Sequence, residues 1–161
     1  MTDEIWVINA SPLILLGKLG RTDLLESLAQ RVIVPQAVFH EVAAGAAGDA
    51  AMEAALAWAT PRVQDDILVP SSISGWDLGA GESQVLAQCL AGGHRAVLDD
   101  GEARAAAKVH SVRLIGSLGV ILRARKAGLI PAARPLVERL IESGSYLAAD
   151  LVRQALHKVG E

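Results

Sequence analysis

The sequence contains one cysteine, few aromatic residues and no long uninterrupted hydrophobic run. A single cysteine excludes a disulfide framework and a cysteine-rich zinc site. No apolar run reaches the roughly 18 residues that a membrane-spanning helix needs. The chain starts with the acidic segment Met1-Thr2-Asp3-Glu4, whereas a secretory signal peptide starts with basic residues. We therefore expect a soluble, cytoplasmic protein without a membrane anchor.

Aliphatic residues must supply the core, because 52% of the 161 residues are hydrophobic but only 3% are aromatic. This composition excludes an intrinsically disordered chain, which is poor in apolar residues and rich in charge. The length suits one domain of ordinary size. We predict a single domain over residues 1–161, in which residues 117–161 form C-terminal helices.

The charges are unevenly distributed along the chain, although the net charge is only −3. Residues 1–94 carry 4 Lys or Arg against 11 Asp or Glu, whereas residues 95–161 carry 11 against 7. An acidic half and a basic half in one small domain favour a carboxylate cluster beside an anion-binding surface. An ordinary mosaic of solvated surface charges is the alternative interpretation.

Short apolar runs alternate with helical patterns along the sequence. Strands are expected at residues 5–8, 32–34, 96–98 and 112–115, with a less definite strand between residues 62 and 70. Thr22 or Asp23 is expected to cap a short helix, and Pro35 is expected to start the next one. Further helices are expected over residues 12–18, 52–58, 82–90, 102–110, 117–127, 132–143 and 147–158. Ser11 is expected to cap the first helix, and the Ser- and Gly-rich residues 71–81 to form a loop. The alternation predicts a three-layer α/β/α domain, with a central parallel sheet covered on both faces.

Polar residues follow two of the expected strands. Asn9 and Ser11 come after the first strand, and Asp99 and Asp100 come after the strand at 96–98. Functional groups of open parallel sheets collect at the carboxyl ends of the strands, so these residues share one crevice if the two strands are neighbours. Because adjacent strand residues point to opposite faces, at most one aspartate is expected to be a direct ligand unless the turn bends.

Two glutamates fall on or beside the apolar stripe of their helices. Glu41 lies three residues after Val38, and Glu82 lies three residues before Val85, so both are expected to point inward. Two carboxylates roughly 4 Å apart repel by about 4 kcal/mol at an effective dielectric near 20, and burial adds a further cost. A divalent cation removes both penalties, and carboxylate, amide and water oxygens suit Mg²⁺ or Mn²⁺.

Each of these residues also has a structural interpretation. Glu82 occupies the first turn of its helix, where negative charge is favourable. The Asp99-Asp100-Gly101 segment can be a turn that caps the next helix, and Asn9 can form a hydrogen bond at the strand end. The convergence of all of them on one edge of the sheet favours a metal site.

Five segments resemble the motifs of a PIN domain in their order and spacing. They are VINASPLILLGKL, VIVPQAVFHEV, GAGESQVLA, VLDDGEAR and LIGSLGVIL, and the resemblance extends from Ile5 to the end of the chain. It is closest to a little-characterised prokaryotic branch of VapC-like proteins. The resemblance implies a compact α/β/α fold and Mg²⁺- or Mn²⁺-dependent endoribonuclease activity on RNA, in which a metal-activated water attacks the phosphodiester.

By position, the resemblance implies that Glu41, Glu82 and Asp99 or Asp100 are metal ligands and that Ser11 orients a ligand or water. It also implies a homodimer and toxin activity that a cognate antitoxin silences. Asn9 departs from the family, because it stands where the family has its first acidic residue. Its amide oxygen can still complete the metal shell, but the lost charge should lower metal affinity and activity.

Two further hypotheses about the function remain open, and the presence or absence of a basic groove helps to distinguish them. Asn9 motivates a catalytically silent PIN-like module that binds RNA or a protein partner. An isolated acidic pocket without a basic groove would favour a different small α/β enzyme, one that acts on a phosphorylated small molecule. A basic track for RNA would use residues of the second half, namely Arg104, Lys108, Arg113, Arg123, Arg125 and Lys126.

Overall fold

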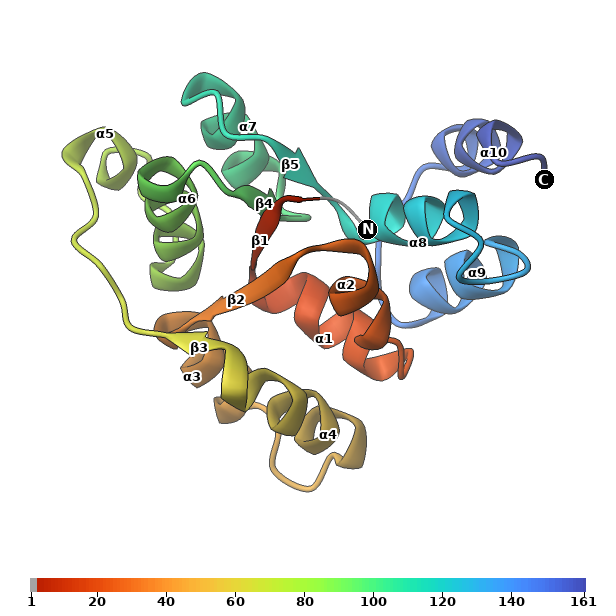
Figure 1. Ribbon diagram of the computed structural model, residues 1–161, viewed down its shortest axis with the longest axis horizontal. Helices are drawn as coiled ribbons and strands as arrows, with labels where there is room; N and C mark the ends of the chain where they lie inside the picture. The colour runs from red at the N-terminus through yellow and green to blue at the C-terminus, as the bar shows by residue number, and fades with distance from the viewer. Residues whose placement is uncertain (1–2) are drawn as a thin grey trace.

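The fold is built around a five-stranded parallel sheet in the order β3-β2-β1-β4-β5. A computed structural model describes residues 3–161 (Figure 1). The strands are β1 (Ile5–Ile8), β2 (Arg31–Pro35), β3 (Val63–Gln64), β4 (Arg95–Val97) and β5 (Leu114–Ile115). Their central residues are buried on both faces, which is why they read as continuous apolar runs rather than alternating ones. The expected parallel sheet is confirmed.

Helices cover the sheet on two sides and produce the three-layer α/β/α arrangement that the sequence predicts. One layer contains α6, which packs on β1 and β4, and the opposite layer contains α1, α2 and α8, which pack together (Figure 1). The helices are α1 (Ala10–Lys18), α2 (Asp23–Leu28), α3 (Gln36–Ala44), α4 (Ala50–Ala59), α5 (Ser71–Ser74), α6 (Ala80–Gly92), α7 (Gly101–Val109), α8 (Ser117–Lys126), α9 (Arg134–Glu142) and α10 (Ala149–Lys158), with a 3₁₀ turn at Thr60–Arg62.

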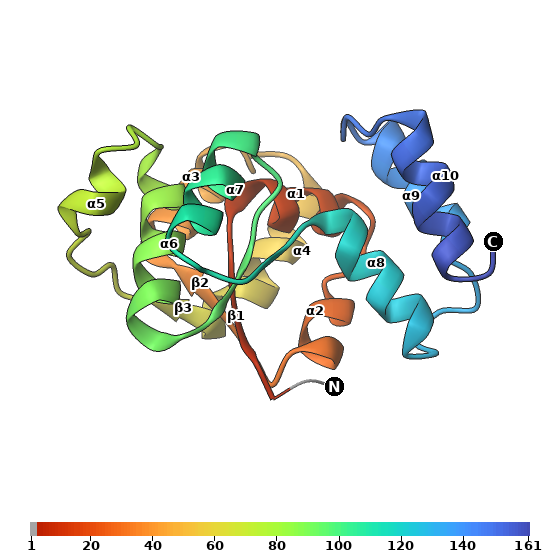
Figure 2. The same cartoon turned by 90° about the horizontal axis from the view of Figure 1, so that it is seen from above.

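The hydrophobic core is aliphatic, as the composition requires. It extends without a break from β1 to Val159 beyond α10, and Trp6 is its only fully buried aromatic residue within the described part of the chain. Figure 2 shows α9 and α10 beyond α8, at the far side from α5. No helix within residues 3–161 is long and apolar enough to cross a membrane. That residues 1–161 act as one domain stays a prediction.

Two local expectations are wrong. The first helix begins at Ala10, so Asn9 rather than Ser11 holds the N-cap position, and Ser11 is an exposed residue of the first turn. The reason is that the Asn9 backbone N–H still pairs with the Val97 carbonyl oxygen at 3.1 Å, so the chain stays extended until Asn9. The expected loop at 71–81 contains the short helix α5, because a helical turn buries Ile73 completely.

Candidate functional site

The carboxyl ends of β1 and β4 meet at the centre of the sheet, because these two strands are neighbours with Ile8 opposite Val97. The predicted condition for a shared crevice is therefore fulfilled. A cavity of about 680 Å³ opens at this edge. The structure brings all six predicted site residues to its wall, namely Asn9, Ser11, Glu41, Glu82, Asp99 and Asp100.

The Asn9 side chain is buried, with 4% of its surface exposed, but its polar oxygen is unsatisfied. An asparagine at an N-cap normally accepts a hydrogen bond from the first turn of the helix. Here the side chain makes no such bond, and Oδ1 has no hydrogen-bond partner within the described residues. An orphaned buried acceptor costs about 1–3 kcal/mol. A cation, or a water bound to one, would supply the missing partner from the cavity.

The two glutamates reach the cavity from different helices, and their burial differs from the expectation. Glu41 on α3 is exposed at the cavity wall, so its predicted inward orientation is wrong. Val38 and Val42 form the buried stripe of α3, and Glu41 lies beside that stripe rather than within it. Glu82 on α6 is only half-buried. The two helices approach closely at Gly81. A Cβ atom on this residue would lie only 3.2 Å from Val38 Cγ2 of α3.

Electrostatic repulsion acts on Glu82. Its pKa lies above the ordinary value, first because burial penalises the charged carboxylate, and then because of negative charge on Asp100, Glu41 and Glu102. Glu41 and Asp100 line the same cavity as Glu82, so their charges act on the Glu82 carboxylate. A bound cation would reverse the sign of this local field.

The two aspartates do not alternate as strand residues would, because β4 already ends at Val97. Asp99 is fixed by Ser117, whose backbone N–H donates to Oδ1 at 2.8 Å and whose hydroxyl donates to Oδ2 at 2.6 Å. Asp100 caps α7 by accepting the Ala103 N–H at 3.0 Å. The turn thus bends and both aspartates line the same cavity, which removes the geometric reason for excluding one of them.

Several residues at or beside the cavity are not among the predicted site residues. Ser117 orients Asp99, and Gly116 lets it do so, since a Cβ atom there would lie 3.0 Å from Asp99 Oδ1. Lys18 on α1 adds one cation to the wall, and residues 143–147 close it from the connection between α9 and α10. For Gly116 and Ser117, the one sequence signal is their place in the LIGSLGVIL segment, directly after the last strand. The 143–147 connection reaches the site only through tertiary packing.

The donor set suits a hydrated cation rather than a closed cage. Within residues 3–161, no group of three His, Cys, Asp or Glu side chains is placed so that it could hold a metal ion. Mg²⁺ usually keeps several waters and takes only one or two carboxylates from the protein. Separate carboxylates around one cavity and the unpartnered Asn9 Oδ1 match that requirement.

A comparison with protein-family models identifies the family of the chain. The model of a family described as a PIN domain, DUF3368, matches residues 5–161. The chain belongs to the PIN-domain family. PIN domains are generally nucleases that use Mg²⁺ or Mn²⁺, so the carboxyl edge of the sheet is the expected place for chemistry in this PIN domain. A search of curated proteins found no match.

One extended segment of the PIN domain ties the two glutamate-bearing helices together. Asp66 Oδ1 accepts the Ala37 N–H at 3.0 Å, and so provides α3 with a cap from 29 residues away. One residue later, the Gln84 side chain of α6 pairs with both backbone groups of Ile67, at 2.9 and 2.7 Å. The segment therefore contributes to the relative position of Glu41 and Glu82.

Removing this distant cap should destabilise the protein. Replacing Asp66 by Ala leaves the first turn of α3 without its side-chain acceptor and should lower the free energy of unfolding by about 1 kcal/mol. Urea denaturation measures the loss. Asp65→Ala is the matched control, because the backbone carbonyl of Asp65, rather than its side chain, accepts from Gln88. Equal losses in both variants would contradict a capping role for Asp66.

The repulsion around Glu82 gives a pH-dependent prediction. A carboxyl group with a raised pKa in the folded state destabilises the fold when it is ionised, and this cost disappears as pH falls below about 4. Without metal, Glu82→Gln should therefore raise the unfolding free energy at neutral pH, by less than about 1 kcal/mol after solvent screening. Denaturation at neutral and acidic pH, with Glu138→Gln as an exposed control, tests this; a gain at acidic pH alone would contradict it.

Proposed function

We propose that the protein is a metal-dependent endoribonuclease of the VapC-like toxin type, which hydrolyses RNA phosphodiesters. The observation that carries the proposal is the gathering of four carboxylates and the unpartnered Asn9 oxygen around one cavity. Membership of the PIN-domain family supports nuclease chemistry in general. A cognate antitoxin, a homodimer and a cytoplasmic location belong to the same proposal.

Each side chain has a role in this proposal. Glu41, Glu82 and one or both of Asp99 and Asp100 would surround Mg²⁺ or Mn²⁺, one or two of them as direct ligands and the others through bound waters, and Asn9 would complete the shell through Oδ1. When bound, the cation supplies an activated water and neutralises charge on the reacting phosphate. Ser11, exposed on the first turn of α1, would orient a water or a phosphate oxygen through its hydroxyl.

Asn9 also favours a second candidate, a PIN-like module that binds RNA or a protein partner without cleaving it. The neutral amide removes one negative charge from the proposed metal shell, which should weaken cation binding. In contrast, an enzyme acting on a phosphorylated small molecule is disfavoured, because the acidic cavity adjoins a cavity lined by arginine and lysine.

Cleavage of a mixed pool of structured RNA separates the first two candidates. Wild type should cleave with Mn²⁺ or Mg²⁺ and not with EDTA, whereas Glu41→Gln and Glu82→Gln should lose most of the activity. All proteins are purified identically, so that a contaminating nuclease appears equally in each sample. Equal cleavage by all three proteins would overturn the proposed site. Saturable RNA binding without any cleavage by wild type would establish the silent module instead.

A further inference from the structure

The sheet ends at β3, and the chain continues beyond β3 in an extended form. β3 is an edge strand, which pairs with β2 on one side only among the described residues. Residues 63–68, which we call the edge segment, are all exposed. Figure 1 shows the chain leading from β3 toward α5 along the outside of the molecule. An edge of this kind offers unpaired backbone groups to a further strand.

Side-chain amides of α6 hold the inner side of the edge segment. The Gln84 side chain pairs with both backbone groups of Ile67, at 2.9 and 2.7 Å, as a neighbouring strand would. The Gln88 amide donates to the Asp65 carbonyl oxygen at 3.3 Å. Both glutamines are buried, so the segment is fixed in an extended form before any partner arrives. Such preorganisation lowers the entropic cost of binding.

The outer side of the edge segment has unpaired backbone groups. Successive residues of an extended chain direct their N–H and C=O groups to opposite sides. Asp65 and Ile67 direct theirs toward α6. Asp66 and Leu68 therefore face outward, and neither forms a backbone hydrogen bond within the described part of the chain. These are the groups with which an added strand would pair.

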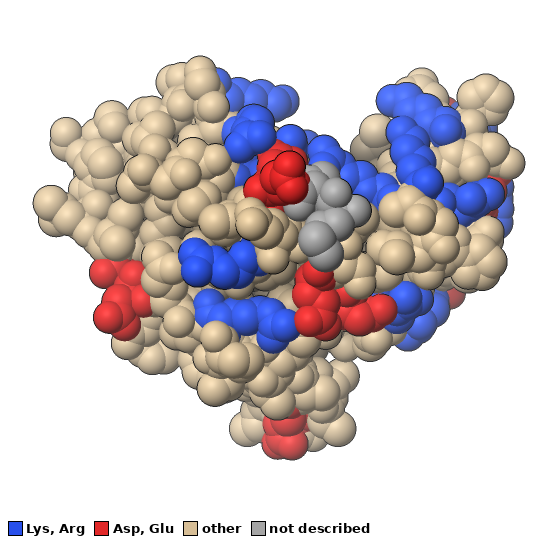
Figure 3. Space-filling model, in the orientation of Figure 1, with Lys and Arg blue, Asp and Glu red and all other residues tan. Residues whose placement is uncertain are grey.

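The side chains of the edge segment combine apolar and acidic surface. Leu68 is 92% exposed, and Val63 and Ile67 are further exposed hydrophobic residues. Asp65 and Asp66 lie between them and form no ion pair with any residue that the structure describes. Figure 3, in the orientation of Figure 1, shows an acidic patch at this edge of the molecule. A strand that fits here should therefore carry both apolar and basic side chains.

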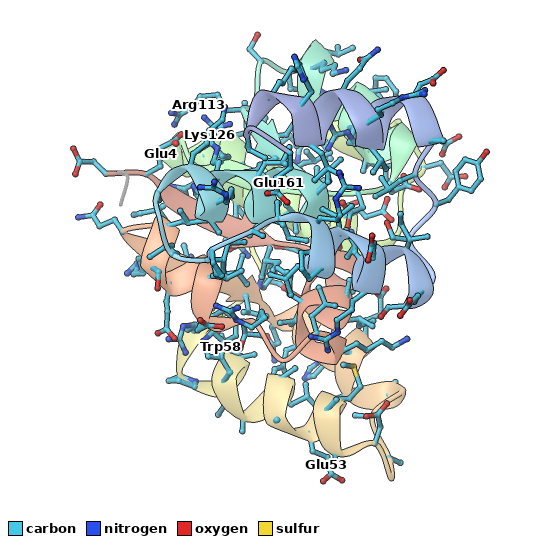
Figure 4. The ribbon with its side chains drawn as sticks, turned by 90° about the vertical axis from the view of Figure 1, so that its right-hand side faces the viewer. Glu4, Glu53, Trp58, Arg113, Lys126 and Glu161 are labelled. Atoms are coloured by element: carbon cyan, nitrogen blue, oxygen red, sulfur yellow. The ribbon has the colours of Figure 1, made fainter. Side chains whose placement is uncertain are left out.

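The nearest basic residue in the sequence is engaged elsewhere. Arg62 forms an ion pair with Glu26 of α2 at 2.8 Å, and its guanidinium lies 4.2 Å from the centre of the Trp58 ring. Figure 4 shows Trp58 between α4 and the rest of the molecule. Arg62 is thus directed toward α2 and α4, which leaves the negative charge of the edge segment for a partner.

A second copy of this chain is a poor occupant of the edge. Antiparallel pairing of the segment with itself would place Asp65 and Asp66 of one copy against the same residues of the other. Like charges directly opposite each other destabilise strand pairing. Nucleic acid and acidic peptides would be repelled for the same reason.

We propose that the edge segment is a docking site for a protein partner, which adds an extended strand of apolar and basic residues to the sheet beside β3. The backbone of the added strand would pair with Asp66 and Leu68. Its apolar side chains would cover Leu68 and Ile67, and its lysines or arginines would face the two aspartates. The inference does not rest on the proposed nuclease function, because no residue of the edge segment lines the acidic cavity.

A synthetic peptide tests the proposal. The probe carries the sequence Val-Val-Lys-Lys-Val-Val between polar flanks, and its symmetry lets it pair with the edge in either direction. Fluorescence anisotropy of the labelled peptide should show saturable binding. Replacing both lysines by glutamate, or methylating the backbone nitrogens, should weaken binding at least about tenfold, because each change removes one of the two kinds of contact.

Variants of the edge segment should weaken binding of the same peptide. Leu68→Ala should lower the affinity at least about threefold, because it removes apolar surface that the peptide covers. Asp65→Asn removes one exposed charge and should lower it about two- to fivefold. Leu151→Ala on α10 and Glu138→Gln on α9 are the matched controls, since both residues are exposed and lie outside the edge segment. They should bind the peptide as wild type does.

Hydrogen exchange shows whether the peptide pairs with the edge. The amide hydrogens of Asp66 and Leu68 should exchange rapidly in the free protein and become protected when the peptide is bound. The amide of Ile67 should be protected in both states, because it already donates to Gln84.

Several results would overturn the proposal. They are the absence of saturable binding, equal binding of the glutamate peptide, wild-type affinity in Leu68→Ala, and unchanged exchange at Asp66 and Leu68 under saturating peptide. Sedimentation provides a further check, because a dimer that Asp65→Asn strengthens would identify the edge as a contact between two copies of this chain. Loss of RNA cleavage in the site variants would leave the docking result unaffected, so the two proposals fail separately.

Discussion

Replacing Asp100 by Asn is expected to lower the affinity for Mn²⁺ at least about 100-fold, whereas Asp99→Asn should lower it only about tenfold. The reason lies in how each carboxylate is engaged. The charge of Asp100 is the foremost neighbouring charge that raises the pKa of Glu82, after burial itself. Asp99 already uses both oxygens to accept hydrogen bonds from Ser117. We therefore expect Asp100 to contribute more to cation binding than Asp99, which Ser117 already engages.

Both substitutions should leave the fold intact, which makes the comparison clean. Asparagine is as good an N-cap as aspartate, so Asp100→Asn keeps an acceptor for the Ala103 N–H. In Asp99→Asn, the amide oxygen can accept the Ser117 N–H, and the Ser117 hydroxyl can rotate to accept from the amide nitrogen. Each variant thus removes one negative charge from the cavity without creating a buried unsatisfied group.

Calorimetric titration with Mn²⁺ gives the two affinities directly, and the rate of RNA cleavage should fall in the same order. The opposite order would assign the direct ligand to Asp99 and leave Asp100 as a helix cap. Equal, small losses from both variants would place the cation elsewhere in the cavity. The measurement does not depend on activity, so it applies equally to an active nuclease and to a silent module.

The residues of the candidate site could be predicted from sequence because the signals that mark them are local. Buried parallel strands read as apolar runs, and polar residues directly after them mark the carboxyl edge. Asn9 and Asp99 follow such runs, and the neighbouring placement of β1 and β4 brings them together. The orientation of Glu82 in its helix is likewise predictable from the spacing of the apolar residues that follow it.

What the sequence did not predict depends on contacts between distant residues. Asp66 caps a helix that starts 29 residues earlier, and Ser117 fixes Asp99 across 18 residues. Neither pair has a local signature, because serine and aspartate occur in many turns. The helical phase of Glu41 predicts that its side chain is buried. However, a residue beside an apolar stripe is buried only where a neighbouring helix covers it, and Glu41 is exposed. Glu41 lies at the cavity wall instead.

Asn9→Asp is expected to raise the affinity for Mn²⁺ about tenfold or more, while it destabilises the protein when metal is absent. A carboxylate at this buried position adds charge to a cavity that already raises the pKa of Glu82. Without a cation, the variant should unfold at a lower temperature than wild type in EDTA, because an uncompensated buried charge is costly. With Mn²⁺ well above its dissociation constant, binding to the folded state should more than restore the difference.

Thermal unfolding of wild type, Asn9→Asp and Asn9→Ala, each in EDTA and in Mn²⁺, checks this crossing pattern. Asn9→Ala removes the unpartnered Oδ1 without adding charge, so it should lose less stability in EDTA than Asn9→Asp and gain the least from Mn²⁺. A variant Asn9→Asp that is destabilised equally in both conditions would show that position 9 does not face the cation.

The same variant decides what the neutral residue means for function. Restoring a charge can increase cleavage only if the other groups, Glu41, Glu82 and Asp100, already hold a reactive arrangement. A rise in both Mn²⁺ affinity and cleavage would therefore identify a nuclease that is weakened at one ligand. A rise in affinity without any cleavage would mean that the remaining carboxylates bind a cation but do not place it against RNA, as expected for a module that binds RNA and leaves it intact.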